Sequence, residues 1–192
     1  MKKDGATLLD LGCAFAQDLR RLVADGVDGR QCYGSDLRLD LIDLGYELFR
    51  DRETLHSKFI AADVFDAESP LTQLYGKIDV INASSFFHLF TRDEQLQIAR
   101  QCVKLLRPQA NSLIVGRHRA QVVAGDTTGK FGPSAKFWHS AESWEQFWTE
   151  IGNEMHVEFD VNVTMTGAKF ERLELAPKPG EDVSMSFSVR RR

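Results

Sequence analysis

This 192-residue chain has no excess of positive charge, no long apolar run and few cysteines. Its formal net charge of −4 leaves none of the basic surface that nucleic-acid binding requires. No segment approaches the roughly 18 consecutive apolar residues of a membrane span, and the first residues show no signal-peptide pattern. The three cysteines lack CxxC spacing, so neither a disulfide framework nor a zinc site is indicated. We therefore expect a cytoplasmic protein with neither nucleic acid nor membrane as a partner.

Glycines are also missing where a dinucleotide-binding turn would need them. Residues 7–11 form a short apolar run with strand character, and a helical pattern begins soon after Gly12. The apolar residues at helical spacing are Phe15, Leu19, Leu22 and Val23. A buried strand that turns tightly into a helix is the first unit of a doubly wound sheet, and its turn lies in the ligand crevice. The G-x-G-x-x-G pattern is reduced here to Gly12, Ala14 and Gln17, which favours a ligand without a diphosphate.

Strand and helix patterns alternate along most of the chain. Further short strands are predicted at residues 31–35, 58–62, 78–83 and 112–116, and helices near 41–49, 70–74, 91–107 and 140–152. The Gly/Thr-rich residues 124–133 are predicted to form a loop. Period-two alternation near residues 157–163 and 183–189 predicts an antiparallel pair at the sheet edge. The pattern predicts one α/β domain over residues 1–192, a Rossmann-like doubly wound, mostly parallel sheet closed by a C-terminal antiparallel hairpin.

Acidic residues stand at the ends of three successive predicted strands. Asp36 lies about 24 residues beyond Gly12, where an acid can accept hydrogen bonds from both ribose hydroxyls. Asp63 ends the next strand and is placed to accept from an adenine amine, while Asp10 can pair with a ligand ammonium. Each acid alone is readily explained as a solvated loop residue or a helix cap. Their occurrence at three successive strand ends favours a binding site for a nucleoside that carries positive charge.

Several strings in the sequence resemble one family. The D-x-G of the first strand, the acid that ends the second and Ala62–Asp63–Val64 at the third are similar to class I S-adenosylmethionine-dependent methyltransferases. The C-terminal antiparallel edge is similar to the hairpin of that family. Longer strings resemble the fungal methyltransferases of meroterpenoid biosynthesis, and they occupy residues 9–13, 17–20, 33–37, 47–52, 59–63, 85–90 and 104–108.

The resemblance implies S-adenosylmethionine as the cofactor and gives the motif residues roles. The implied cofactor-binding residues are Asp10 and Gly12 at the methionine part, Asp36 and Leu37 at ribose and adenine, Asp63 and Val64 at the adenine edge, and Ala83 and Ser84 near the sulfonium. The sequence departs from the family at Ala16, where glycine is more frequent, and we expect the extra methyl group to narrow the cofactor turn.

A second departure lies at the start of the chain. Family members carry helices before the first strand that help to cover cofactor and substrate, whereas this chain reaches that strand within about half a dozen residues. We expect a single methyltransferase domain without these lid helices. The lid is then absent, removed by truncation, or supplied by a homodimer or another partner.

The acceptor side of the site carries fewer signals. The ends of the fourth and fifth strands read Asn82–Ala83–Ser84 and Gly116–Arg117–His118, without the carboxylates of a metal-assisted reaction, so no metal is expected. His88 follows the fourth strand and is the candidate catalytic residue, as a general base or as a donor to a carboxylate acceptor. A packed or capping histidine is an equally simple interpretation. Arg117, His118 and His139 are expected on loops near the acceptor. The aromatic residues that could line an apolar acceptor pocket are Phe86, Phe87, Phe90, Phe137 and Trp138.

Three functions follow from these features. The first is a metal-independent O-methyltransferase that acts on a small, largely apolar natural-product acid or phenol, as in carboxyl methylation of a meroterpenoid. The second is a methyltransferase-like binding or scaffold protein with weak or no activity, which the missing lid and Ala16 suggest. The broken glycine pattern disfavours the third, a nicotinamide-dependent oxidoreductase.

Overall fold

A seven-stranded sheet with the order β3-β2-β1-β4-β5-β9-β8 organises the protein. The computed structural model describes residues 5–127, 135–166 and 182–192. The strands are β1 Leu8–Leu11, β2 Cys32–Asp36, β3 Lys58–Ala61, β4 Val80–Asn82, β5 Leu113–Gln121, β8 Phe159–Thr166 and β9 Asp182–Arg191. From β3 to β5, neighbouring strands are parallel, while β9 pairs antiparallel with both β5 and β8. This arrangement confirms the predicted doubly wound, mostly parallel sheet with an antiparallel edge.

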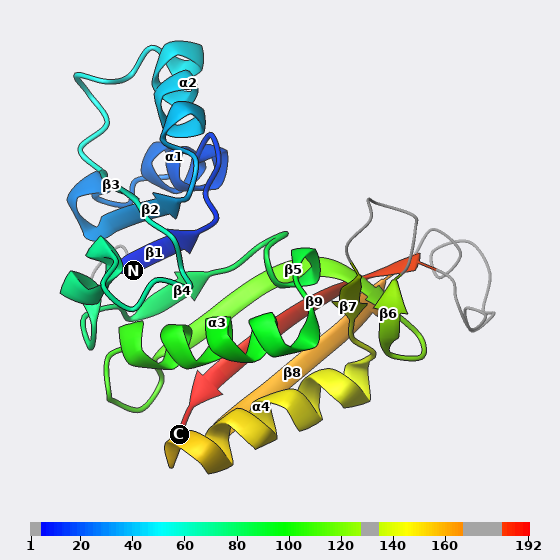
Figure 1. Cartoon of the computed structure of the whole chain (residues 1–192). Helices are drawn as coiled ribbons and strands as arrows, with labels where there is room; N and C mark the ends of the chain where they lie inside the picture. Colours follow the sequence, from blue (N-terminus) through cyan, green and yellow to red (C-terminus); the bar gives the residue numbers. More distant parts are fainter. Residues whose placement is uncertain (1–4, 128–134, 167–181) are drawn as a thin grey trace.

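Helices lie on both faces of this sheet (Figure 1). Helices α1 (Gln17–Ala24) and α2 (Leu39–Phe49) cover one face near β1, β2 and β3, and α3 (Arg92–Leu105) and α4 (Ala141–Met155) cover the other. The 3-10 turns in the described ranges are η1 Gly29–Gln31, η2 Pro70–Leu74 and η3 Phe87–Leu89. Strand β6 (Gly125–Thr127) pairs antiparallel with β7 (Lys136–Trp138). No helix in the described ranges has the length and apolar content needed to cross a membrane.

Capping residues and an aromatic core fix the helices on the α3–α4 face. The Thr91 hydroxyl and the Glu94 carboxylate form the predicted capping box at the start of α3, and Ser140 caps α4. The core beneath α4 contains the fully buried rings of Phe87, Trp144 and Phe147. Because these rings anchor the segment that follows β4, they also set the position of the site at the strand ends.

Three details differ from the prediction. Strand β5 extends to Gln121, because β9 pairs with it along its whole length, so Arg117 and His118 belong to a strand and not to a loop. The predicted loop 124–133 contains β6, and its residues 128–133 lie outside the described residues. Phe15, predicted on the inward stripe, precedes α1 and is 38% exposed, because the turn before the helix continues to Ala16.

Candidate functional site

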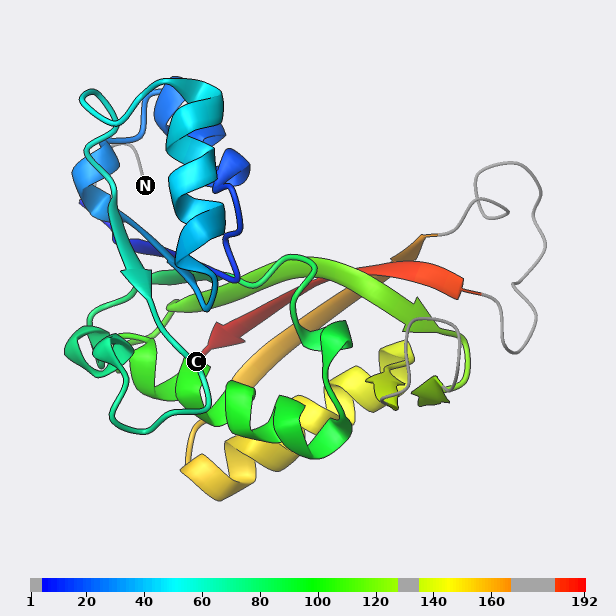
Figure 2. The same cartoon turned by 45° about the horizontal axis from the view of Figure 1, so that its top comes forward.

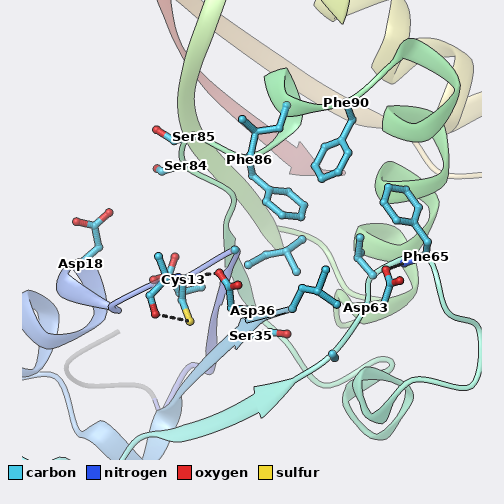
Figure 3. Close-up of a pocket in the computed structure, with 18 of the residues that line it drawn as sticks. Cys13, Asp18, Ser35, Asp36, Asp63, Phe65, Ser84, Ser85, Phe86 and Phe90 are labelled. Carbon is cyan, nitrogen blue, oxygen red and sulfur yellow. Dashed lines mark hydrogen bonds between the residues drawn. The ribbon is translucent and has the colours of Figure 1, made fainter. Parts of the chain in front are cut away.

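A cavity of about 720 Å³ opens at the carboxyl ends of β1, β2, β3 and β4. Its wall includes seven of the predicted cofactor residues, namely Asp10, Gly12, Asp36, Leu37, Asp63, Val64 and Ser84. Carboxyl ends of parallel strands meet at one edge of the sheet, so residues far apart in sequence share this cavity. Figure 3 shows Asp36 in the middle of the site, with Asp18 on one side and Asp63, next to Phe65, on the other.

The turn between β1 and α1 forms the floor of the cavity. The amides of Gly12 and Cys13 both donate to the carbonyl oxygen of Ser35 in β2, at 2.8 and 3.0 Å. Gly12 has φ +74°, and a Cβ atom there would lie 2.4 Å from the Phe86 ring. Glycine is therefore required both by backbone conformation and by the close approach of Phe86.

Two alanines in the same turn also adopt left-handed backbone conformations, Ala14 with φ +46° and Ala16 with φ +52°. For a residue other than glycine, this backbone conformation costs roughly 1–2 kcal/mol. The expectation that the Ala16 methyl narrows the cofactor turn is wrong. Ala16 does not line the cavity; it is buried behind the turn in a cluster with Leu19 and Ile42.

Asp36 is held by two backbone amides. Ala14 N–H donates to its Oδ2 atom at 2.8 Å, and Arg38 N–H donates to its Oδ1 atom at 2.9 Å. A carboxylate has about four lone-pair positions, so each oxygen keeps one for a ligand. The side chain is thus oriented in advance to accept two further hydrogen bonds.

The end of β3 contributes a second acid and an aromatic wall. The Asp63 Oδ1 atom accepts from Phe65 N–H at 2.9 Å, which fixes the turn that carries Val64 into the cavity. The Phe65 and Phe86 rings each lie edge-to-face against Phe90, with centroids 5.3 and 5.2 Å apart. Figure 3 shows the three rings together on one side of the cavity. This wall is suited to the flat face of an adenine or of an apolar acceptor.

Asp10 is the most buried acid in the cavity, with 6% of its surface exposed. Its Oδ1 atom accepts from the Asn82 amide at 2.8 Å, and the Asn82 Oδ1 atom accepts from the Ser84 hydroxyl at 2.7 Å. Burial is the main cause that raises the Asp10 pKa to about 7, and the nearby carboxylates of Asp18 and Asp36 act in the same direction. A ligand cation beside Asp10 would relieve this cost and favour the ionised form.

The comparison with known families agrees with this geometry. The sequence profile described as a methyltransferase domain matches residues 9–111, which include all three acids and the segment that follows β4. The chain belongs to this methyltransferase family.

Curated relatives in this family are fungal proteins. The chain is 46% identical over 160 residues to the O-methyltransferase phiE of Fungal sp., a match that covers 82% of this chain and 53% of the relative. It is 42% identical over 160 residues to the Asnovolin E/Chermesin D methyltransferase nvfJ of Aspergillus novofumigatus, covering 81% of this chain and 58% of the relative. The chain thus spans about half the length of the curated relatives that it matches.

Solved methyltransferase structures share the fold. The 1,6-didemethyltoxoflavin-N1-methyltransferase of Burkholderia thailandensis superposes with a TM-score of 0.67 at 13% identity, covering 97% of this chain and 71% of that chain. The magnesium protoporphyrin IX methyltransferase of Synechocystis gives 0.60 at 15% identity, covering 97% and 70%. At this identity the likeness concerns the architecture alone.

Two predicted site residues do not line the cavity. Ala83 is fully buried beneath it, and its amide donates to Val115 in β5 at 2.8 Å. His88 lies behind the aromatic wall, where its carbonyl oxygen accepts from the Trp138 indole at 3.1 Å and its ring faces His118, with centroids 6.2 Å apart. Burial lowers the His88 pKa to about 4, so the ring is neutral at pH 7 and a weak base.

The other predicted acceptor residues fall into two groups. Arg117 lines the cavity and is exposed. His118 points to the opposite face of the sheet, against Trp144 at a centroid distance of 4.8 Å, and His139 hydrogen-bonds Ser143 and Gln95 beside α4. These two histidines are part of the core. In the described ranges, no group of three or more His, Cys, Asp or Glu side chains is arranged to hold a metal ion.

The sequence reasoning missed the part played by Asn82. Asn82 lies directly opposite Asp10 in the parallel pairing of β1 with β4, which places its amide beside that carboxyl group. The pairing of β1 with β4 would have predicted this contact, because neighbouring strands bring together residues 72 positions apart. Other lining residues that were not predicted follow the motif residues closely, and they include Cys13, Gln17, Asp18 and Phe65.

Proposed function

We propose that this chain forms the cofactor-binding part of an S-adenosylmethionine-dependent O-methyltransferase of fungal secondary metabolism. The observation that carries the proposal is the gathering of Asp10, Asp36 and Asp63 in one cavity at successive strand ends. The relatives named as O-methyltransferases support the type of reaction. When bound, the cofactor would supply a methyl group on a positively charged sulfur.

The described residues fit the nucleoside part of this cofactor. Asp36 keeps one free lone-pair position on each oxygen, which matches the two hydroxyl donors of a ribose. Asp63 and Val64 would meet the adenine edge, and Leu37, 67% exposed at the rim, would cover one face of the base. Gly12 lines the same cavity, and its missing Cβ atom leaves the room that the Phe86 ring occupies beside it.

The residues around Asp10 fit the charged part. A cation favours ionisation of this buried carboxyl group, and Ser84 and Asn82 continue a hydrogen-bonded row from Asp10 along the end of β4. The ammonium of the methionine part is the group that Asp10 would hold, while Ser84 would lie toward the reacting centre. These residues orient the methyl donor, and transfer itself requires an aligned acceptor close to it.

The acceptor that suits the remaining wall is a largely apolar acid. Among the described residues that line the cavity, Arg117 is the one basic side chain, and it stands in β5 next to the segment that carries Ser84 and Ser85. The Phe86 and Phe90 rings provide apolar surface beside it. A carboxylate acceptor is already ionised at neutral pH, so its methylation needs no general base.

The proposed activity is tested by incubating the purified chain with methyl-labelled S-adenosylmethionine and a panel of apolar carboxylic acids and matched phenols. Transfer of label to an acid supports the proposal. Retention of the cofactor without transfer to any acceptor would instead support a binding or scaffold protein. An absence of measurable affinity at millimolar cofactor would contradict the proposed activity and leave only a scaffold protein that has lost the cofactor.

Replacing Arg117 by methionine is expected to raise KM for an acid acceptor about 10–100-fold, because a hydrogen bond to a charged group contributes roughly 1.5–3 kcal/mol. The dissociation constant of S-adenosylhomocysteine, measured by calorimetry, should change less than about twofold. If the dissociation constant of S-adenosylhomocysteine rose while the KM for the acceptor stayed the same, Arg117 would be shown to bind the cofactor's own carboxylate.

Replacing His88 by glutamine is expected to change kcat by less than about threefold, since the ring lies outside the cavity and is a weak base. The measurement is kcat at saturating cofactor between pH 6 and pH 9. A decrease in kcat of about 100-fold or more, with unchanged cofactor affinity, would show that His88 acts as the general base.

A further inference from the structure

Arg20 and Asp51 do not line the cavity, and they meet on the sheet face that α1 and α2 cover. Arg20 lies in α1, within residues 17–20, and Asp51 follows α2, within residues 47–52. Figures 1 and 2 both show the two helices side by side. The Arg20 Nε and Nη2 atoms donate to the Asp51 Oδ2 and Oδ1 atoms at 2.7 and 3.0 Å, a bidentate ion pair that joins the two segments.

This ion pair is enclosed, unlike its neighbours on the surface. The side chains of Arg20 and Asp51 are 8% and 19% exposed. The guanidinium lies 4.7 Å from the Phe49 ring centroid and 5.3 Å from that of Tyr46. The adjacent Arg21 side chain is 77% exposed, and it pairs with Asp25 on the outside of α1. A buried charge of this kind is maintained only when its hydrogen bonds are satisfied.

The third hydrogen bond of Arg20 reaches the cofactor turn. Its Nη1 atom donates to the carbonyl oxygen of Phe15 at 2.5 Å. That carbonyl lies between Ala14 and Ala16, the two residues with left-handed backbone conformation. Such conformations persist when the surrounding structure holds them in place. Gly45 of α2 leaves the necessary room, because a Cβ atom there would lie 2.8 Å from the same carbonyl oxygen.

The turn that Arg20 holds is the one that orients Asp36. Ala14 lines the cavity, and its amide is one of the two that bind the Asp36 carboxylate. A shift of the Phe15 carbonyl would rotate the preceding peptide units and misalign this amide. Arg20 therefore connects the α1–α2 packing to the ribose-binding carboxylate without touching the cavity.

We propose that Arg20 is a positioning residue for cofactor binding, acting with Asp51 through the Phe15 carbonyl. The inference rests on the proposed function for the identity of the ligand. It gives a role to Arg20 and Asp51, neither of which lines the cavity. Its consequence is that affinity for the cofactor depends on an ion pair outside the binding cavity.

The test compares Arg20→Met, Arg20→Lys and Asp51→Asn with Arg21→Met, a control that removes the same charge from the next position of α1. Affinity for S-adenosylhomocysteine is measured by calorimetry at 15 °C, after circular dichroism has shown each variant to be folded. We expect the dissociation constant to rise at least tenfold in Arg20→Met and to stay within twofold in Arg21→Met. Lysine can pair with Asp51 but cannot also reach the Phe15 carbonyl oxygen. Arg20→Lys should therefore have a higher melting temperature than Arg20→Met, while its affinity for S-adenosylhomocysteine stays as low.

A second readout needs no ligand. Amide hydrogen exchange followed by NMR should be at least tenfold faster at Ala14 and Ala16 in Arg20→Met, while the Leu9 amide in β1 keeps its rate. Unchanged exchange at the two alanines, or cofactor affinity within twofold of the unmodified chain in folded Arg20→Met or Arg20→Lys, would overturn the inference. If the unmodified chain fails to bind S-adenosylhomocysteine, the proposed function falls, and exchange alone decides whether Arg20 holds the turn.

Discussion

Replacing Asp36 by asparagine is expected to weaken S-adenosylhomocysteine binding at least 100-fold, about 2.7 kcal/mol. The carboxylate uses one lone pair of each oxygen for the amides of Ala14 and Arg38 and offers the other two to ribose hydroxyls. In asparagine an NH₂ group replaces one of the two oxygens. This NH₂ group would face a backbone N–H donor, and the ligand would lose a charged hydrogen-bond acceptor. The measurement is the dissociation constant by calorimetry at pH 8.

Asp40→Asn is the matched control for this variant. Asp40 lies four residues further along, is exposed, and forms a surface ion pair with Arg38. Exposed pairs contribute little to stability, so affinity should stay within twofold and the melting temperature should be nearly unchanged. Equal losses in Asp36→Asn and Asp40→Asn would contradict the assignment of Asp36 to the ribose, since the effect would then come from the general loss of negative charge.

The acids of the cavity were predictable because their position depends on topology. A parallel sheet places the ends of successive strands along one edge, so an acid at or just beyond the carboxyl end of a strand reaches the same crevice whatever the details of the loops. Asp10, Asp36 and Asp63 satisfy this condition, and all three line the cavity. The antiparallel edge was predictable for a similar reason, since the alternation in β9 corresponds to one buried face.

The position of the His88 ring was not predictable, because side-chain direction in a turn follows from its dihedral angles and not from periodicity. Ser85 adopts φ +56°, and the chain then enters the short η3 turn. Phe86 consequently covers Gly12, while His88 faces His118 behind the wall. The contact of Arg20 with Asp51 was hidden in the same way, since these residues are 31 positions apart and meet only through helix packing.

Replacing Asp10 by asparagine is expected to stabilise the ligand-free protein at pH 8 by about 2–4 kcal/mol. The carboxyl group is buried and its pKa is raised from 3.8 to about 7. Above pH 7 the folded protein therefore holds an ionised group that would be better solvated in the unfolded chain. Asparagine is neutral at every pH, and its carbonyl oxygen can still accept the hydrogen bond from the Asn82 amide.

The direction of the pH dependence follows from the raised pKa. Between about pH 4 and pH 7 the folded protein binds more protons at Asp10 than the unfolded chain, so this group lowers stability progressively as pH rises through that window. The gain from Asp10→Asn should be near zero at pH 4 and largest above pH 7. Chemical denaturation at pH 4, 6 and 8 measures it, and a gain independent of pH would show that ionisation of Asp10 is not the cause.

Asp10→Asn should also weaken cofactor binding, because the ionised carboxylate that destabilises the fold is the group that would hold the ligand ammonium. A ligand ammonium needs the ionised form of Asp10, so the affinity of the unmodified chain for S-adenosylhomocysteine should fall about tenfold from pH 8 to pH 6. In Asp10→Asn the affinity should be weak and nearly constant over this range.

Asp18→Asn is the control, because Asp18 lines the same cavity but is exposed. If Asp18→Asn also removed the pH dependence, the titrating group would not be Asp10. Greater stability combined with lost affinity in Asp10→Asn alone would show that a buried acid is kept for binding at the expense of the fold.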